Sequence, residues 1–295
     1  MAEEMRMILE ELITIMITTR NRRDDLAFTL EKLISLQLAH LPLILVDDAS
    51  DASIISDELV SKFPRIKIVR NQVQRGLISN RNEMALLSVT PYVLSLDDDS
   101  CFRDAPDLQR AVEYLAQQPR VVALQFNNVD IHFGDEAVTG SEPYRVQTYT
   151  GCGHLLKRSE FLRMGGYRAD FIHMGEEVDF CRKAWRAGLE VHMYPKIIVD
   201  HRRTPVARFP AKNLYYLTRN YLIINYLHLP WPTMTGKVFS NALLIWWRNL
   251  RQRYLWPSVF RGWIDGIKYC LAHFRERAPM SRRQYREYLR APVSK

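Results

Sequence analysis

Two apolar, β-rich runs in the first hundred residues are each followed by acidic side chains, at Asp47–Asp48 and at Asp97–Asp99. In an extended segment alternate side chains share a face, so we expect Asp97 and Asp99 to point one way and Asp98 the other. Two carboxylates on one face suit Mg²⁺ or Mn²⁺ bound together with a phosphate, and such an ion would neutralise a diphosphate leaving group. The structural alternative is a solvated acidic turn that caps the next helix, and it accounts best for Asp98.

A second group of acids opens a predicted helix in the other half of the chain. Glu176, Glu177 and Asp179 fall in its first turn, where the helix dipole by itself favours acids. Glu177, however, lies in register with Cys181 and Ala184 on the apolar side of the helix, which a purely solvated acid would avoid. A carboxylate held at the wall of a cavity is a suitable general base for a hydroxyl nucleophile.

His201 follows a further β-rich run, at residues 197–200. Alone, a histidine in such a place is more often a capping or core residue than a ligand. Beside an acidic metal site it is a candidate third ligand, because neutral imidazole binds divalent transition metals.

The elements that must position these side chains alternate along the first 126 residues. Continuous apolar strands between amphipathic helices predict an α/β fold, with a parallel sheet that is covered by helices on both faces. In such sheets ligands bind at the carboxyl ends of the strands, which is where the acids and the stretch Thr18-Thr19-Arg20-Asn21 stand. The predicted strands are Leu12–Ile17, Leu43–Val46, Ile66–Val69, Tyr92–Leu96 and Val121–Phe126, and the predicted helices begin at Asp24 and span Ile54–Phe63, Ser79–Ser88 and Ala105–Gln117.

In their order and spacing, these motifs resemble the inverting nucleotide-sugar glycosyltransferases of family 2, which have the GT-A fold. The resemblance covers roughly residues 12–225, which is most of the chain. It implies a Rossmann-like, mostly parallel sheet flanked by helices, with a C-terminal helical extension. The stretches that match are Thr18–Asn21, Val46–Ser50, Gly76–Asn82, Leu96–Asp99, Gly165–Tyr167, Gly175–Asp179 and His201.

The resemblance implies which residues meet the nucleotide and the metal. Asp47 would read the base of the nucleotide, with Asp48 beside it as the second candidate, and Arg81 would lie near the nucleotide. Asp97 would face the ribose, and Asp99 would take the cofactor, Mg²⁺ or Mn²⁺. The donor would be a UDP- or dTDP-sugar. The expected contacts to the nucleotide sugar are Thr18, Arg20, Asn21, Asp47, Asp48, Arg81, Asp97 and Asp98, and the expected metal ligands are Asp99, Asp97 and His201.

The resemblance also implies the acceptor side of the site. Glu177 falls where the family has the aspartate base of a Glu-Asp motif, and since this sequence has Glu-Glu instead, the base is Glu177 or Glu176. The implied reaction is a single displacement with inversion, in which the deprotonated acceptor hydroxyl attacks the anomeric carbon. The Gln-x-x-Arg-Trp motif of processive synthases is not found, which favours the transfer of one sugar or a few. The expected acceptor contacts are Gly151, Gly153, His154 and Asp179.

Charge and composition change towards the C-terminal third of the chain. Residues 1–200 carry 23 Lys and Arg against 30 Asp and Glu, whereas residues 201–295 carry 18 against 3. An acidic body followed by a strongly basic tail indicates two tasks, the second of them directed at something anionic. We expect a GT-A catalytic domain over residues 1–209, with a nucleotide-binding half at about 12–126 and an acceptor half at about 127–209, and a basic, aromatic-rich helical extension over 210–295.

The tail interleaves tryptophans with arginines. Amphipathic helices of this composition suit an anionic bilayer surface, which is where a lipid-linked glycan acceptor of cell-surface polysaccharide synthesis would be found. An equally supported alternative is that the aromatic side chains of the tail pack against the body of the protein or against a second subunit. The pattern Tyr215-Tyr216-x-x-Arg219-Asn220 resembles the segment after the catalytic domain in rhamnosyltransferase-like and galactofuranosyltransferase-like bacterial members. The tail residues concerned are Trp231, Trp246, Trp247, Trp256, Trp263, Arg248, Arg251, Arg253 and Arg261.

Two other classes of function compete with sugar transfer. A nucleic-acid-binding protein would explain the charge of the tail but not the acids at the strand ends, which repel phosphates, so we expect no nucleic-acid partner. The second class is a nucleotide-sugar-binding protein without transfer activity. It is supported by the Glu-Glu pair that stands where the family has Glu-Asp. A secretory signal and an apolar run of about 20 residues are both missing, and the four cysteines are scattered. We therefore expect a cytoplasmic protein, or one that is peripheral on the inner face of the cell membrane.

Overall fold

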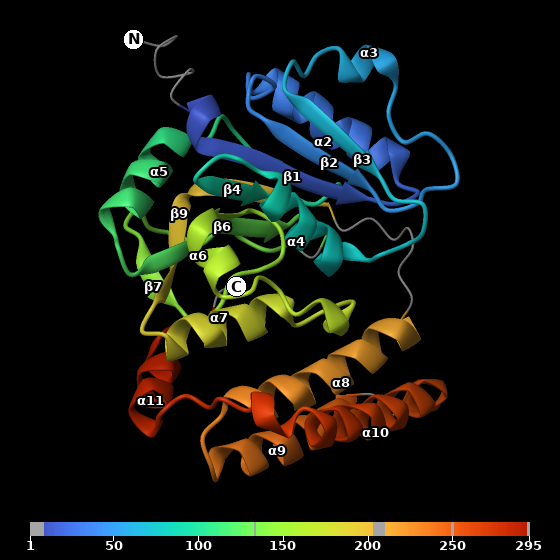
Figure 1. The fold of residues 1–295 in the computed structure, drawn as a ribbon, viewed down its shortest axis with the longest axis vertical. Helices are drawn as coiled ribbons and strands as arrows, with labels where there is room; N and C mark the ends of the chain where they lie inside the picture. Colours follow the sequence, from blue (N-terminus) through green and yellow to red (C-terminus); the bar gives the residue numbers. More distant parts are fainter. Residues whose placement is uncertain (1–8, 133, 203–209, 249–250, 294–295) are drawn as a thin grey trace.

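The computed structural model describes residues 9–132, 134–202, 210–248 and 251–293 of the chain. Within these residues the protein has one nine-stranded sheet, in the order β3-β2-β1-β4-β8-β6-β9-β5, with β7 paired to β9. Helices cover the sheet, and the C-terminal helices form a further layer (Figure 1). The strands are β1 (Ile13–Thr19), β2 (Leu43–Asp47), β3 (Ile66–Arg70), β4 (Tyr92–Ser95), β5 (Ser100–Phe102), β6 (Val121–Asp130), β7 (Tyr144–Val146), β8 (His154–Lys157) and β9 (Glu190–His201).

The pairing of the strands changes from parallel to mixed after β4. Strands β3, β2, β1 and β4 are all parallel, as the continuous apolar runs predict. Strand β8 then enters antiparallel between β4 and β6, while β6 and β9 are parallel to each other. The two short strands β5 and β7 pair antiparallel with β9. The α/β prediction is therefore confirmed, and the sheet is parallel in its first four strands and mixed beyond them.

The helices follow the predicted order, with local differences in length. Helix α2 buries Leu26, Leu30 and Leu33 along one stripe, as the helical spacing predicts. The helix predicted over Ile54–Phe63 is only the four-residue α3. The helices are α2 (Arg23–Ser35), α3 (Asp57–Val60), α4 (Leu77–Leu87), α5 (Leu108–Gln117), α6 (Arg158–Arg163), α7 (Glu176–Arg186), α8 (Pro210–His228), α9 (Thr233–Arg248), α10 (Trp256–Ala272) and α11 (Arg282–Arg290).

Two apolar clusters fill the two faces of the sheet. Along β1, Ile13 and Ile15 belong to the cluster under α2 and α5, whereas Met16 belongs to the cluster under α4 and α7. Alternate residues of a strand point to opposite faces, so a strand that is covered on both sides must be apolar at nearly every position. This double burial explains the continuous apolar runs and fixes which strand ends face the site.

The C-terminal helices are packed against the body of the protein. Ile223 and Leu227 of α8 lie in the same apolar cluster as residues of α7, and Tyr269 of α10 joins them. Helices α8, α9 and α10 lie together beneath α7 (Figure 1). The proposed division at residue 209 falls in residues 203–209, which lie outside the described part of the chain. In the described residues, each helix is too short or too polar to span a bilayer.

Candidate active site

A cavity of about 410 Å³ lies at the carboxyl ends of β1 and β4. The segment around Ile172 and the first turn of α8 close its other side, where Lys212 lies in the wall. The structure thus brings together side chains from seven separate parts of the sequence. The predicted site residues that line this cavity are Thr18, Arg20, Asn21, Asp48, Asp97, Asp98, Asp99 and His201.

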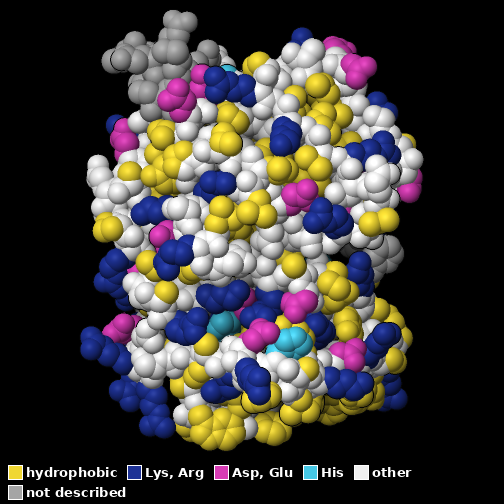
Figure 2. All heavy atoms as spheres, in the orientation of Figure 1, with side chains coloured by type: hydrophobic (Ala, Val, Ile, Leu, Met, Phe, Trp, Pro, Cys, Tyr) yellow, Lys and Arg dark blue, Asp and Glu magenta, His cyan; other side chains and the backbone are white. Residues whose placement is uncertain are grey.

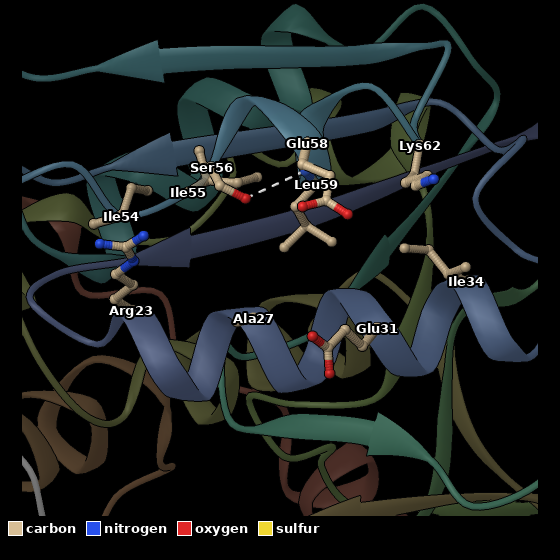
Figure 3. A pocket seen from close by; sticks show the side chains of 10 residues that line it. All are labelled: Arg23, Ala27, Glu31, Ile34, Ile54, Ile55, Ser56, Glu58, Leu59 and Lys62. Atoms are coloured by element: carbon tan, nitrogen blue, oxygen red, sulfur yellow. Dashed lines mark hydrogen bonds between the residues drawn. The ribbon is translucent and has the colours of Figure 1, made fainter.

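A second cavity, of about 300 Å³, lies between α2 and α3 (Figure 3). Its wall combines aliphatic side chains such as Ile34 and Leu59 with isolated charges such as Arg23 and Glu31. None of the predicted site residues lines it. Of these two cavities, only the larger one is lined by predicted site residues.

The segment Asp97–Asp99 is a turn rather than an extended strand end. The backbone N–H of Ser100 donates to the carbonyl oxygen of Asp97 over 3.1 Å, which closes the turn. Arg22 donates to Asp98 Oδ1 over 2.7 Å and to Asp99 Oδ2 over 2.6 Å, so one guanidinium holds these two carboxylates. The prediction that Asp97 and Asp99 share a face with Asp98 opposite is wrong, because strand alternation does not apply within a turn.

The two carboxylates that Arg22 binds differ in acidity. Burial raises the pKa of Asp98 to about 7, against the opposing charge of Arg22. Burial acts in the same direction on Asp99, but its hydrogen bonds and charge contacts with His201 and Arg22 hold its pKa well below the usual range. Asp99 is therefore the stronger acid of the pair.

Asp97, Cys152 and His201 form the one group of potential metal ligands found among the described residues. One ligand atom from each lies within 4.8 Å of the other two. An oxygen, nitrogen and sulfur donor set fits a transition metal better than Mg²⁺, which prefers oxygen alone. Asp99 lies beside this group, with its Oδ1 3.2 Å from His201 Nε2. Cys152 was not predicted, although its place between Gly151 and Gly153 puts it in the predicted acceptor loop.

Arg81 forms ion pairs with acidic side chains from both predicted halves of the catalytic domain. Its Nη2 donates to Asp97 Oδ1 over 2.6 Å and to the carbonyl oxygen of Gly151 over 2.7 Å. Its Nη1 lies 3.3 Å from both Glu176 Oε1 and Glu177 Oε1. Burial disfavours the charge of this guanidinium, but the three carboxylates raise its pKa further than burial lowers it. Arg81 is buried and does not line the cavity, and its connection to the cavity wall runs through Asp97.

The two candidate bases, Glu176 and Glu177, differ in their access to solvent. Glu177 keeps 14% of its side chain exposed, against 2% for Glu176. Burial and the neighbouring Glu176 raise the pKa of Glu177 well above its usual value, while Arg81 opposes the shift. A raised pKa brings a carboxylate closer to the pKa of a useful general base at neutral pH. Of the two, Glu177 has the better access for an acceptor hydroxyl.

Because Gly151 has no side chain, Glu177 and Arg81 can lie close to its backbone. A Cβ at residue 151 would lie 2.5 Å from Glu177 Oε1 and 3.0 Å from Arg81 Nη1. We expect Gly151→Ala to displace Glu177 and to lower the turnover of a transfer assay by about 10²-fold, since a shift of about 1 Å in a reacting group has this effect. The control is Gly236→Ala, where an added Cβ meets nothing within 4 Å. Near-normal turnover of the Gly151 variant would contradict the placement of Glu177.

The predicted acceptor contact of His154 is wrong. The ring is fully buried, with Nδ1 3.0 Å from the carbonyl oxygen of Thr150 and Nε2 3.1 Å from the hydroxyl of Tyr167. A carbonyl only accepts, so Nδ1 carries the proton and Nε2 accepts from Tyr167. Burial, aided by the charge of Arg81, holds the pKa of His154 well below its usual value. His154 is a neutral core residue that supports the Gly151–Gly153 loop.

The predicted acceptor contact of Asp179 is also wrong. Its side chain is fully buried, 2.8 Å from His228 Nε2 and 2.7 Å from Lys183 Nζ. Burial alone would raise its pKa, but His228 and Lys183 hold the pKa well below the usual range. Because His228 belongs to α8, Asp179 anchors the base-bearing helix α7 to the C-terminal helices.

Of the two aspartates predicted to contact the base of the nucleotide, only Asp48 lines the cavity. Asp47 Oδ1 accepts from the backbone N–H of Ser50 over 2.9 Å, and Asp47 does not line the cavity. Asp48 lines the cavity and accepts from the backbone N–H groups of Arg75 and Gly76. These donors lower the pKa of Asp48 against the effect of burial. The placement favours Asp48 over Asp47 for a contact with the nucleotide.

Asn220 was missed as a residue of the site. Its Nδ2 lies 3.1, 2.9 and 2.8 Å from the carbonyl oxygens of Phe171, His173 and Met174. This segment carries two non-glycine residues with positive φ, Ile172 and Met174, which need such support. The Tyr-Tyr-x-x-Arg-Asn pattern was the available signal, but spacing alone does not tell which loop an α8 side chain holds.

The sequence and the fold have known counterparts. Residues 14–182 match the family model of glycosyl transferase family 2. A pre-mycofactocin glycosyltransferase of Mycobacterium tuberculosis is 26% identical over 223 residues, which are 69% of this chain and 46% of that protein. Polypeptide N-acetylgalactosaminyltransferase 3 of Taeniopygia guttata is 25% identical over 217 residues, which are 60% of this chain and 35% of that protein. The chain thus spans less than half the length of these relatives.

Solved structures share the fold at low identity. GalNAc-T7 with UDP, GalNAc and Mn²⁺ superimposes with a TM-score of 0.61 at 16% identity, over 77% of this chain and 49% of that one. The mannosyltransferase PcManGT from Pyrobaculum calidifontis, with GDP-Man and Mn²⁺, gives a TM-score of 0.55 at 15% identity, over 88% of this chain and 75% of that one. These likenesses confirm the GT-A fold. With the family match over more than half of its length, the chain belongs to glycosyl transferase family 2.

Proposed function

We propose that this protein is a metal-dependent, inverting glycosyltransferase that moves one sugar from a nucleoside-diphosphate sugar to a hydroxyl of a glycan or lipid-linked glycan. The observation that carries the proposal is the Arg81 network, which links an accessible glutamate to the acidic cavity wall. This link supports a reaction in which the general base acts next to the donor site. The families and folds of the matched glycosyltransferases support the same class of reaction.

In the proposed mechanism Glu177 takes the proton of the acceptor hydroxyl. The hydroxyl oxygen forms a bond to the anomeric carbon while the bond from that carbon to the diphosphate breaks, so the configuration inverts and the electron pair leaves with the diphosphate. Arg20 and Lys212 in the cavity wall are placed to bind the phosphates. A divalent ion, Mg²⁺ or Mn²⁺, held by Asp97 and His201 would supply Lewis-acid stabilisation of the leaving group.

A panel of nucleotide sugars tests the proposal. We expect one class among UDP-, dTDP- and GDP-sugars to raise the melting temperature in the presence of Mn²⁺ or Mg²⁺, since ligand at 100 times Kd stabilises a protein by about 2.7 kcal/mol. The co-crystallised UDP and GDP-Man of the structural neighbours guide the choice of donors. Stabilisation by no nucleotide sugar would overturn the proposal. Binding of a donor without transfer to any glycan acceptor would favour a binding protein instead.

The C-terminal layer has an exposed apolar surface, and this surface favours the proposal that the acceptor is linked to a lipid. We call it the α9–α10 face. It runs along the lower edge of the molecule, where hydrophobic side chains gather with Lys and Arg beside them (Figure 2). An exposed patch of this kind marks an interaction site, and aromatic side chains beside cations suit an anionic bilayer. Its members are Phe239, Leu243, Leu244, Trp246, Trp247, Tyr254, Phe260, Ile264, Ile267 and Leu271, with the exposed cations Lys237, Arg251, Arg253, Arg261 and Lys268, while the side chain of Arg248 lies outside the described part.

Vesicle sedimentation tests the membrane partner. We expect the protein to bind phosphatidylglycerol vesicles and to be released by salt, and we expect Leu243→Glu with Trp247→Glu to abolish the binding. The control is Val89→Glu, at a valine that is 91% exposed and is not part of the α9–α10 face. Equal binding by the double variant would contradict the proposal. A dimer in solution that the double variant dissociates, without lipid binding, would assign the face to a second subunit.

A further inference from the structure

The loop around Cys152 is held firmly at the edge of the cavity. Asn128 Nδ2 donates to the carbonyl oxygen of Cys152 over 2.5 Å, and the backbone N–H of Gly153 donates to the carbonyl oxygen of Ser95 over 2.9 Å. Gly153 has a φ of +64°, and a Cβ there would lie 2.5 Å from Asn128 Oδ1. The loop therefore passes close to β6 and β4, and this close approach fixes the position of the Cys152 side chain.

The thiol of Cys152 shares its surroundings with two other ligand groups. The potential ligand atoms of Asp97, Cys152 and His201 lie within 4.8 Å of one another, close enough to surround one ion. The remaining cysteines, Cys101, Cys181 and Cys270, join no such group in the described part of the chain. Cys152 differs from them by its neighbours rather than by its burial, since all four are buried.

His201 is oriented by a carboxylate outside this group of three. Asp99 Oδ1 lies 3.2 Å from His201 Nε2, and Asp99 is in turn held by Arg22. A ligating histidine usually donates its other ring N–H to a carboxylate, which fixes its tautomer and orientation. With Nε2 directed at Asp99, Nδ1 is the nitrogen whose lone pair is available in the neutral ring. Asp99 therefore serves as the positioning partner of the histidine.

We propose that Cys152 is a metal ligand, and that Asp97, Cys152 and His201 together form a site that selects thiophilic divalent ions such as Zn²⁺, Co²⁺ and Cd²⁺ over Mg²⁺. Thiolate sulfur favours these softer ions, whereas Mg²⁺ takes oxygen ligands and keeps its water. The inference deepens the proposed function, on which it rests for the role of a bound ion in transfer. The existence of the site itself rests only on the geometry of these three residues.

Cobalt titration of the full-length, metal-free protein tests the site without an activity assay. We expect Co²⁺ to produce the near-ultraviolet absorption of a cobalt–thiolate bond and to saturate at one equivalent. The band should vanish in Cys152→Ser and persist in Cys101→Ser, a buried cysteine on β5 that serves as the matched control. The affinity for Cd²⁺ should fall at least about tenfold in Cys152→Ser, while that for Mg²⁺ stays unchanged. Circular dichroism and melting temperature check the fold, and Cys152→Ala replaces the serine variant if that variant unfolds.

The outcomes separate this inference from the proposed function. Binding of Co²⁺ without a thiolate band, or a band that survives in Cys152→Ser, overturns the assignment of Cys152 even if sugar transfer with Mn²⁺ is observed. A thiolate band that depends on Cys152 supports the site even if every nucleotide sugar fails to bind. In the second case the proposed function fails and the metal site stands.

Discussion

Replacing Glu177 by glutamine is expected to lower turnover in a transfer assay by about 10²- to 10⁴-fold, while nucleotide-sugar binding changes little. Glutamine keeps the size of the side chain but cannot accept the proton of the acceptor hydroxyl. Binding should survive because Glu177 does not line the cavity, whereas most of the predicted nucleotide contacts do. Initial rates measured at saturating donor, with the donor affinity from a separate titration, check both parts.

The pH dependence of the same assay gives a second test of Glu177. Burial and Glu176 raise the pKa of this carboxyl, so a larger fraction is protonated at neutral pH than for an exposed glutamate. A base must be deprotonated to act, so turnover of the unmodified protein should rise with pH and then level off. In Glu177→Gln this rise should disappear.

Glu176→Gln is the matched control for the choice of base. Glu176 shares the Arg81 contact with Glu177 but has only 2% of its side chain exposed. We expect a smaller loss of turnover, and a rise of turnover with pH that is kept but shifted to lower pH, because the charge of Glu176 no longer raises the pKa of Glu177. If Glu176→Gln is the inactive variant and Glu177→Gln is not, the roles of the two residues are exchanged.

Replacing Arg81 by methionine is expected to destabilise the protein by about 3–5 kcal/mol at pH 7. Methionine has a similar length but no charge, so Asp97, Glu176 and Glu177 would lose their shared cation in a largely buried site. Removing one partner of a buried ion pair is costly because the remaining charge is left without compensation. Denaturant unfolding at several pH values measures the effect.

The pH dependence of this loss has a definite sign. Arg81 opposes the raised pKa of Glu177, so without Arg81 this pKa rises further in the folded state and the folded variant binds a proton more readily than the unfolded chain. Its stability deficit should therefore shrink as the pH falls from 7 towards 5. The control is Arg75→Met, whose ion pair with Glu83 is exposed and should contribute no more than about 1 kcal/mol. A deficit for Arg81→Met that is equally small would show that the network is not held by Arg81.

The first half of the fold could be predicted because its signals are local. The apolar runs that became β1 to β4, and the stripe of Leu26, Leu30 and Leu33 on α2, follow from side-chain periodicity within a few residues. The edge at which Asp48, Asp97 and His201 gather follows from the rule that parallel strands present their carboxyl ends together. The entry of β8 between β4 and β6 could not be predicted, because no local pattern encodes which strand becomes a neighbour.

The sequence by itself determined the family, the fold class and the residue types at the cavity, because apolar periodicity and motif order are properties of short stretches. The tertiary structure alone decided how those residues are used. It closed Asp97–Asp99 into a turn, bound Arg22 to Asp98 across 76 positions, and joined Arg81 to Glu176 across 95. It also buried His154 and Asp179 and brought Cys152 beside His201. Charge pairing and metal ligation depend on distances in space, and these are set only when the whole chain packs.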